Sequence, residues 1–253
     1  MRGARASARC LLFLVAWHPL MVQAAGSTVE RAASLTSLFP AEQVQALSSV
    51  LPADQEVRWK LHLPVDAETP SGLLVFVSPS ESGEPPPGWV DVLDEQKLMW
   101  IAAEGFGNQH RSNQRVLAAL MALTFATRHY SIDPSRTYIA GMSGGGRIAS
   151  MTITKFPRLF RGAIYIVGVD FWTSAEAASL DSIAANRYVF ITGDRDFNRR
   201  ETQRVFEKYR AAGVERALLM DLPRFGHELP DAERLTQAVQ FLDGAAEPKI
   251  PRN

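Results

Sequence analysis

Short apolar runs alternate with helical patterns along most of this 253-residue chain, and this alternation limits the folds that it can adopt. We expect a strand near the sheet edge from the alternating polar and apolar residues 56–63. The apolar runs predict strands at residues 72–77, 98–103, 137–140, 162–167, 188–192 and 217–222. The helical patterns lie at residues 41–51, 112–130, 145–156, 199–212 and 230–242. Strands that alternate with helices of this length predict an α/β fold, a mostly parallel twisted sheet with helices on both faces.

We expect Asp133-Pro134 to form the turn before the fourth strand. This strand leads into Gly141-Met142-Ser143-Gly144-Gly145, and a helical pattern follows at once. A Gly-x-Ser-x-Gly sequence between a strand and a helix is typical of a nucleophile elbow, a turn so tight that its serine projects from the edge of the sheet. The serine has a strained backbone there, and the flanking glycines leave room where the strand and the helix nearly touch. The motif therefore predicts that Ser143 is a nucleophile.

A serine hydroxyl is a weak nucleophile at neutral pH, so Ser143 needs a base within hydrogen-bonding distance. Among the five histidines of the sequence, His227 is the one in an expected loop downstream of the elbow. This loop follows the strand at residues 217–222 and precedes the last helix, and Gly226 leaves the imidazole free to turn toward the serine. We therefore interpret His227 as the general base.

An imidazole base needs a carboxylate that fixes its tautomer and stabilises its cation. In folds with such an elbow, this acid lies between the serine and the histidine along the chain. The segment after the strand at residues 188–192 offers Asp194 and Asp196, and we favour Asp196 because Asp194 falls directly in the turn. Asp194 stays open as an alternative, as does Asp170, which follows the strand at residues 162–167.

The oxyanion of a tetrahedral intermediate needs two backbone N–H donors. Gly144, directly after the nucleophile, supplies one of them at the positive end of the following helix. The second normally comes from a loop that corresponds here to Ser78-Pro79-Ser80, after the strand at residues 72–77. Because Pro79 has no N–H group, we assign the second donor to Ser80, with Ser78 as the alternative.

Three further side chains follow expected strands or loops and are candidates for contacts with a substrate. Asn108, after the strand at residues 98–103, has the donors and acceptor to hydrogen-bond a substrate, and Trp172 has the size to form the wall of an acyl or aryl pocket. Trp89, behind a proline-rich loop, is a candidate for the rim of the site. The alternative interpretation is structural: Asn108 closes a turn and Trp172 covers the core.

With these positions placed, the chain resembles the α/β-hydrolase superfamily, and within it the secreted polyhydroxybutyrate-depolymerase and feruloyl-esterase branch. The resemblance covers about residues 56–242 and rests on residues 131–146, which read Ser-Ile-Asp-Pro-Ser-Arg-Thr-Tyr-Ile-Ala-Gly-Met-Ser-Gly-Gly-Gly, together with Gly193-Asp194-Arg195-Asp196 and Gly226-His227. It implies the α/β-hydrolase fold. It also implies hydrolysis of esters through a Ser143–His227–Asp196 triad and an acyl-enzyme, without a cofactor.

The chain departs from this family pattern at two places. Family members usually carry His-Gly where this chain has Ser78-Pro79, in the loop of the second oxyanion donor. The sequence also contains no separate carbohydrate-binding or polymer-binding module. A small or soluble ester is therefore a better expected substrate than an insoluble polymer.

The first 25 residues have the pattern of a secretory signal peptide. Arg2, Arg5 and Arg9 form a basic start, an apolar centre follows, and Ala24-Ala25 is a small-residue exit. We expect cleavage there, export to the periplasm or the extracellular space, and a single domain of residues 26–253. The apolar centre is too short to span a bilayer, so we expect no membrane span in the mature form; an uncleaved anchor helix is the alternative.

Composition excludes several other functions. The formal net charge is zero, which gives no basis for nucleic acid as a partner. The sole cysteine, Cys10, lies in the expected leader, and the histidines lack the paired spacing of metal ligands, so we expect no metal and no cofactor. A non-catalytic binding protein of the same fold, or a peptidase or acyltransferase with the same triad, remains an alternative to the esterase, and the sequence leaves the oligomeric state open.

Overall fold

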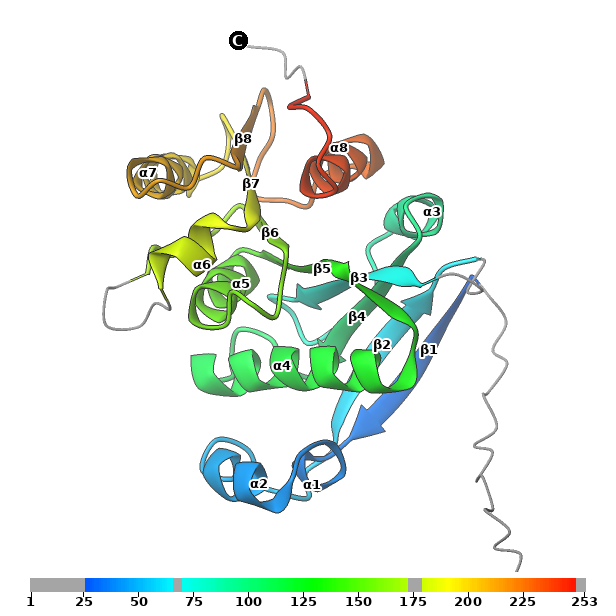
Figure 1. Cartoon of the computed structure of the whole chain (residues 1–253). Helices are drawn as coiled ribbons and strands as arrows, with labels where there is room; N and C mark the ends of the chain where they lie inside the picture. Colours follow the sequence, from blue (N-terminus) through cyan, green and yellow to red (C-terminus); the bar gives the residue numbers. More distant parts are fainter. Residues whose placement is uncertain (1–25, 66–69, 173–178, 249–253) are drawn as a thin grey trace, which may run out of the picture.

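The computed structural model describes residues 26–65, 70–172 and 179–248, and these residues form an eight-stranded sheet flanked by helices (Figure 1). The expected signal peptide, residues 1–25, lies outside the described residues. The strands are β1 (Ser27–Ala33), β2 (Val57–Leu63), β3 (Ser71–Val77), β4 (Leu98–Glu104), β5 (Ile132–Met142), β6 (Gly162–Ile166), β7 (Arg187–Gly193) and β8 (Ala217–Leu222). The helices are α1 (Leu35–Leu38), α2 (Ala41–Leu47), α3 (Trp89–Glu95), α4 (Ser112–His129), α5 (Gly144–Lys155), α6 (Leu180–Ala184), α7 (Arg199–Ala211) and α8 (Ala232–Leu242).

The strand order is β1-β2-β4-β3-β5-β6-β7-β8. β2 pairs antiparallel with both β1 and β4, and all of the pairs from β4 to β8 are parallel. β4 lies on one side of β3 and β5 lies on the other, so the direction in which strands are added reverses between β3 and β5. The carboxyl ends of these two strands therefore lie at the topological switch point of the sheet. Ligands of open α/β sheets bind at such a point.

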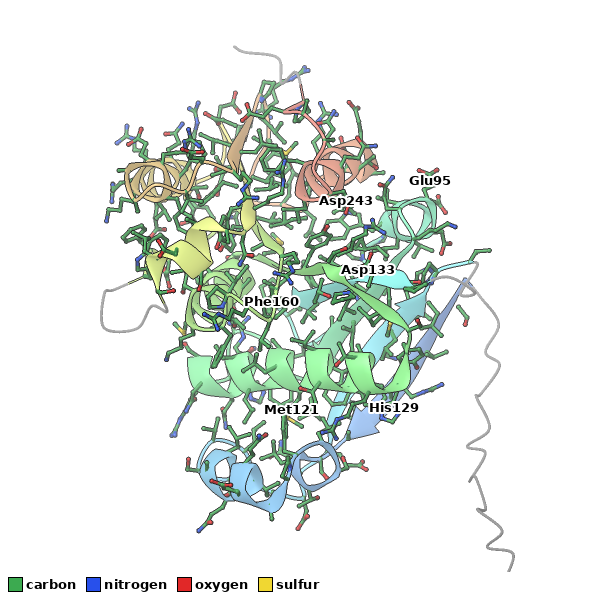
Figure 2. The ribbon with its side chains drawn as sticks, viewed as in Figure 1. Glu95, Met121, His129, Asp133, Phe160 and Asp243 are labelled. Atoms are coloured by element: carbon green, nitrogen blue, oxygen red, sulfur yellow. The ribbon has the colours of Figure 1, made fainter. Side chains whose placement is uncertain are left out.

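The helices cover the sheet in two layers because its central strands are apolar on both faces. One buried cluster lies beneath α4, α5 and α7, and the other lies beneath α3 and α8. Figure 1 shows these two groups on opposite sides of the sheet, with the α1–α2 pair beyond α4. Side chains fill the space between α4 and this pair, where the buried Met121 lies (Figure 2).

All of the expected strands and helices are present, with most ends shifted by one to four residues, but the structure adds β1, α1, α3 and α6. β1 is an edge strand whose side chains alternate between half-buried and exposed, so it lacks the continuous apolar run that marks the central strands. Two of the added helices, α1 and α6, have four and five residues, too few for a helical period to be visible in the sequence. The third, α3, has seven residues and directly follows the proline-rich loop.

The amino end of β5 is tied to α8 by a group of polar side chains. Arg136 donates from Nε and Nη2 to the two carboxylate oxygens of Asp243, at 2.8 and 2.7 Å, and Tyr138 Oη donates to Asp243 Oδ1 at 2.6 Å. Burial, and then the bond to Asp243, raises the pKa of Tyr138. Figure 2 labels Asp243, just beyond α8, and Asp133, in β5. Asp133-Pro134, expected as a turn before the strand, lies inside β5, at a register shift in its pairing with β3.

Within the three described ranges, no helix combines the length and the apolar content that crossing a membrane requires.

Candidate active site

Ser143 lies between the end of β5 and the start of α5, with φ 53° and ψ −120°. A positive φ is costly for a residue with a side chain, so the surrounding packing must enforce this conformation. A Cβ on Gly141 would collide with the carbonyl of Gly145, and a Cβ on Gly145 would collide with the carbonyl of Val77. The strand, the helix and the neighbouring β3 therefore approach so closely that only glycine fits at either position. The turn has the geometry of a nucleophile elbow.

Three side chains from three loops form one series of hydrogen bonds at this turn. His227 Nε2 lies 2.8 Å from Ser143 Oγ, and His227 Nδ1 lies 2.9 Å from Asp196 Oδ1. Because an ionised carboxylate only accepts, Nδ1 carries the ring proton and Nε2 is free to accept from the serine hydroxyl. The structure thus brings together the three residues that the sequence singled out as nucleophile, base and acid.

Asp196 is enclosed, whereas His227 is partly open to solvent. The carboxylate of Asp196 is 0 % exposed, and the His227 side chain is 21 % exposed. Thr192 Oγ1 donates to Asp196 Oδ2 at 2.7 Å, and the Asn198 N–H donates to Asp196 Oδ1 at 3.1 Å. These bonds satisfy a buried charge and fix the oxygen that faces the imidazole.

The two alternative acids have other environments. Asp194 is exposed, and its backbone N–H donates to the carbonyl of Leu222. Asp170 Oδ1 accepts from Arg147 Nη1 at 2.8 Å, and Arg147 also donates to Glu201. Asp196 is therefore the carboxylate that the structure places on the imidazole of His227.

The two expected oxyanion donors lie at the start of α5 and in the loop after β3. Gly144 is the first residue of α5, so its N–H belongs to the positive end of the helix. In the loop after β3, the Ser80 N–H donates to Ser78 Oγ at 3.2 Å, and the two serine hydroxyls are 3.0 Å apart. The expected second donor is therefore already hydrogen bonded within its own loop.

Comparison with known proteins agrees with this architecture. The sequence model of the prolyl oligopeptidase family matches residues 112–220, which include Ser143 and Asp196. No curated protein sequence is significantly similar to this chain.

Several solved structures are similar in fold. FphF, a fluorophosphonate-binding serine hydrolase of Staphylococcus aureus, has a TM-score of 0.64 and 11% identity, over 88% of this chain and 100% of its own. EstE1, a thermostable carboxylesterase cloned from a metagenomic library, has a TM-score of 0.63 and 14% identity, over 89% and 91%. A ferulic acid esterase has a TM-score of 0.61 and 15% identity, over 85% and 98%.

The chain has the α/β-hydrolase fold. This confirms the fold that the sequence predicted, and at these identities the similarity concerns the fold. In this α/β-hydrolase fold the elbow follows β5, the acid follows β7 and the histidine follows β8, all at the carboxyl edge of the sheet.

Arg115 is a residue of this α/β-hydrolase fold that the sequence analysis did not single out. It lies on α4, is 5 % exposed, and donates to the carbonyls of Phe106 and Ser78 at 3.1 and 2.8 Å. Its Nη1 also donates to Asn108 Oδ1 at 3.1 Å and to the carbonyl of Gly144 at 3.4 Å. Burial lowers the pKa of this guanidinium, and the charge of Glu81 opposes that shift. The sequence contained one signal for Arg115: it is an arginine near the amino end of an expected helix, where the helix dipole disfavours a cation.

Phe197 is a second residue that the sequence analysis missed. Its ring stacks on the imidazole of His227, with centroids 4.0 Å apart and planes 22° apart, yet the residue is 77 % exposed. An exposed aromatic ring beside Asp196 therefore covers one face of the His227 imidazole in this α/β-hydrolase fold.

The expected substrate-binding residues have separate locations. Asn108 is exposed beside Gly144. Trp172 stacks on Phe171 with centroids 4.2 Å apart and lines a pocket of about 330 Å³ between α5 and α7. Neither Ser143 nor His227 is among the described residues that line this pocket.

The expectation for Trp89 was wrong. Its side chain is 1 % exposed and donates from Nε1 to the carbonyl of Pro230 at 2.9 Å, so it belongs to the core beneath α3 and α8. The proline-rich loop before it gave no indication that its aromatic ring would turn inward onto the sheet. In the described residues, no three His, Cys, Asp or Glu side chains are grouped as metal ligands would be.

Proposed function

We propose that this chain is a serine hydrolase that cleaves carboxylic esters, with Ser143 as the nucleophile, His227 as the general base and acid, and Asp196 as the carboxylate partner. The observation that carries this proposal is the series of hydrogen bonds from Asp196 through His227 to Ser143. The strained backbone of Ser143 supports it, because it holds the hydroxyl out from the sheet toward the imidazole.

In the acylation half of the reaction, His227 Nε2 accepts the proton of Ser143 Oγ while Oγ attacks the carbonyl carbon of the ester. The resulting imidazolium is stabilised by the buried Asp196 carboxylate. It then donates its proton to the leaving alcohol as the ester C–O bond breaks, which leaves an acyl group on Ser143. In deacylation a water molecule takes the place of the serine and the same proton transfers repeat.

The negative charge of the tetrahedral intermediate would be held by the N–H of Gly144, at the amino end of α5, and by a second donor. We propose Ser80 as the backbone donor on the other side. Its N–H would have to exchange its bond to Ser78 Oγ for a bond to the oxyanion.

The substrate class is supported by the similar structures, among them a carboxylesterase and a ferulic acid esterase. We propose a small or soluble ester. Asn108, beside Gly144, lies where it would contact the reacting group. Trp172 lies in the pocket between α5 and α7, so we propose that it contacts a more remote part of a substrate.

Peptide cleavage is the second candidate, because the sequence model that matches residues 112–220 describes the prolyl oligopeptidase family. The same triad serves both reactions, and the leaving group separates them. We expect p-nitrophenyl esters to be hydrolysed with a kcat/KM at least 100-fold above that of peptidyl p-nitroanilides. The reverse ratio would make the protein a peptidase.

The first experiment is labelling of the purified protein with a fluorophosphonate probe, which phosphonylates an activated serine. We expect labelling of the wild type and none of Ser143→Ala, with parallel hydrolysis of p-nitrophenyl acetate. A folded wild-type protein that neither reacts with the probe nor hydrolyses the ester would be a binding protein of this fold.

We propose further that residues 1–25 direct export and that residues 26–253 form the mature, single-domain enzyme, in the periplasm or outside the cell. Expression of the full chain in a secreting host tests this. The exported protein is expected to begin at Ala25 or Gly26, and retention of the leader on membrane-bound protein would contradict export.

A further inference from the structure

The side chain of Asn108 lies against the first residue of the elbow helix. A Cβ added to Gly144 would collide with Asn108 Oδ1 and would lie 3.2 Å from Asn108 Nδ2. The carboxamide therefore lies on the Cα of Gly144, one residue from Ser143. Asn108 is nevertheless exposed to solvent.

Arg115 determines which end of this amide faces the site. Arg115 Nη1 donates to Asn108 at 3.1 Å, and a guanidinium has only donors, so the atom that faces it must be the amide oxygen. The two N–H bonds of Nδ2 then point away from Arg115. Arg115 is itself held by the carbonyls of Phe106 and Ser78, which leaves it little freedom to release the oxygen of Asn108.

We propose that Asn108 Nδ2 is a side-chain donor of the oxyanion hole and that Arg115 is the positioning residue that turns this amide nitrogen toward Ser143. The proposal rests on the proposed function, since it assigns a further role within the same ester-cleaving site. It applies to the tetrahedral intermediate, whose oxyanion would accept from the N–H of Gly144 and from Nδ2 of Asn108, with the Ser80 N–H joining them once it has released Ser78 Oγ.

The loop after β3 explains why a side-chain donor is needed here. Pro79 has no N–H, and the N–H of Ser80 already donates to Ser78 Oγ at 3.2 Å. The N–H of Asn108 donates to the carbonyl of Pro79 at 3.0 Å, so the loops after β3 and β4 are joined and the Asn108 side chain is carried to the position beside Gly144. The loop after β3 thus offers few free backbone N–H donors, and the side-chain amide of Asn108 supplies an additional one.

Arg115 joins every segment that contributes to this arrangement. Its guanidinium donates to Ser78 after β3, to Phe106 and Asn108 after β4, and to Gly144 at the start of α5. A cation that donates to these four acceptors fixes the distance between Gly144 and the amide of Asn108 before substrate binds. Such prior positioning is what makes oxyanion stabilisation effective.

The substitution Asn108→Asp separates this catalytic role from a structural one. A carboxylate has nearly the same shape, still accepts from Arg115 and adds an ion pair to it, so we expect Tm to stay the same or rise. At the same time it replaces the donor with a negative oxygen beside the developing oxyanion. With p-nitrophenyl acetate we expect kcat to fall by at least about 100-fold, the size of effect found when an oxyanion donor is removed, with KM changed by less than about threefold.

Two further variants of Asn108 and its neighbourhood complete the test. Asn108→Ala removes the donor without adding charge and is expected to lower kcat by about 100-fold. Asn113→Asp, on the exposed start of α4, adds the same charge without touching the site and is expected to keep the wild-type kcat. A wild-type kcat in Asn108→Asp or Asn108→Ala would overturn the role of Nδ2.

The role of Arg115 is tested by Arg115→Lys, which keeps the charge but loses the planar group that reaches several acceptors at once. We expect kcat to fall by about tenfold, and we expect the double variant Asn108→Ala/Arg115→Lys to be no slower than Asn108→Ala alone, because both act through one amide. Losses that multiply in the double variant would show that Arg115 acts independently of Asn108.

The wild type and Ser143→Ala are measured in the same series. If the wild type hydrolyses the ester and Ser143→Ala does not, while Asn108→Asp remains fully active, the role of Asn108 fails and the proposed function stands. A wild type without Ser143-dependent hydrolysis overturns both.

Discussion

On one side of Ser143, the proposed base side, His227 and Asp196 come from the loops after β8 and β7. The proposed oxyanion side is formed by backbone groups, the amide of Asn108 and the buried cation Arg115. The base side is held by local bonds. Asp196 accepts from Thr192 and Asn198, and the Arg195 N–H donates to the carbonyl of Phe225 between the two loops. On the oxyanion side, the loops after β3 and β4 and the start of α5 all accept hydrogen bonds from Arg115.

This difference determines whether a substitution on each side would affect turnover alone or turnover together with stability. On the base side, each residue has one chemical task, so a substitution should remove turnover and leave the fold intact. On the oxyanion side, the geometry depends on a single guanidinium that also satisfies buried carbonyls, so substitutions there should affect stability and turnover together.

The largest effect is expected on the base side, from Ser143→Ala and His227→Ala. Each should lower kcat for p-nitrophenyl acetate by about 10⁴-fold to 10⁶-fold, because without the nucleophile or its base only binding and oxyanion stabilisation remain. Steady-state kinetics of the two single variants and of the double variant measure this. Losses that multiply in the double variant would show that the two residues do not act as a unit.

The next largest effect is expected from Asp196→Ala, and it is compared with that of Asp194→Ala. We expect the first to lower kcat by about 10⁴-fold, because the imidazole loses the carboxylate that fixes its tautomer, and the second to change it by less than about threefold. Asp194 is the matched control, two residues away and exposed. Equal losses in the two variants would mean that the acid has been misassigned.

A mixed effect is expected on the oxyanion side, from Arg115→Met. Loss of the charged hydrogen bonds to buried carbonyls should lower the free energy of unfolding by about 3 kcal/mol. For a domain of this size, that change lowers Tm by roughly 10 °C. Thermal unfolding measures Tm, and steady-state kinetics below the transition measure kcat. An unchanged Tm would contradict the view that this side of the site depends on one cation.

The smallest effect is expected from Phe197→Ala, back on the base side. The exposed ring covers His227 but makes none of the bonds that orient the imidazole, so kcat should fall by no more than about fivefold. Tm should change little, because the ring is mostly in solvent. A loss of 100-fold or more would show that the stack, together with Asp196, holds the imidazole in place.

The fold was predictable because the strands that form the centre of the sheet are continuous apolar runs and the helices between them are long. β1 was missed because an edge strand has only one half-buried face, and α1 and α6 were missed because four or five residues carry too little periodicity. Asp133-Pro134 was read as a turn because proline is common there, although the register shift between β3 and β5 accommodates it inside the strand.

At the site, the sequence was informative wherever a side chain has a distinctive chemistry and a fixed order along the chain. Ser143, Asp196 and His227 follow three different strands, and the parallel sheet brings the ends of those strands to one edge. Trp89 was misread because the size of its ring is compatible with both a rim and a core, and only its packing beneath α3 and α8 distinguishes them.

The amino-acid sequence by itself determined the order of the central strands and long helices, the glycines of the elbow, and Ser143 and His227 as two of the residues that meet there, because each depends on local pattern or on residue chemistry. The tertiary structure alone decided which carboxylate faces His227, that the Ser80 N–H is already bonded, and that Arg115 turns the amide of Asn108. The first of these features depends on the distance between two loops that are far apart in the chain, and such distances are set by the packing of the whole sheet. The other two depend on loop and side-chain conformations that no local sequence pattern fixes.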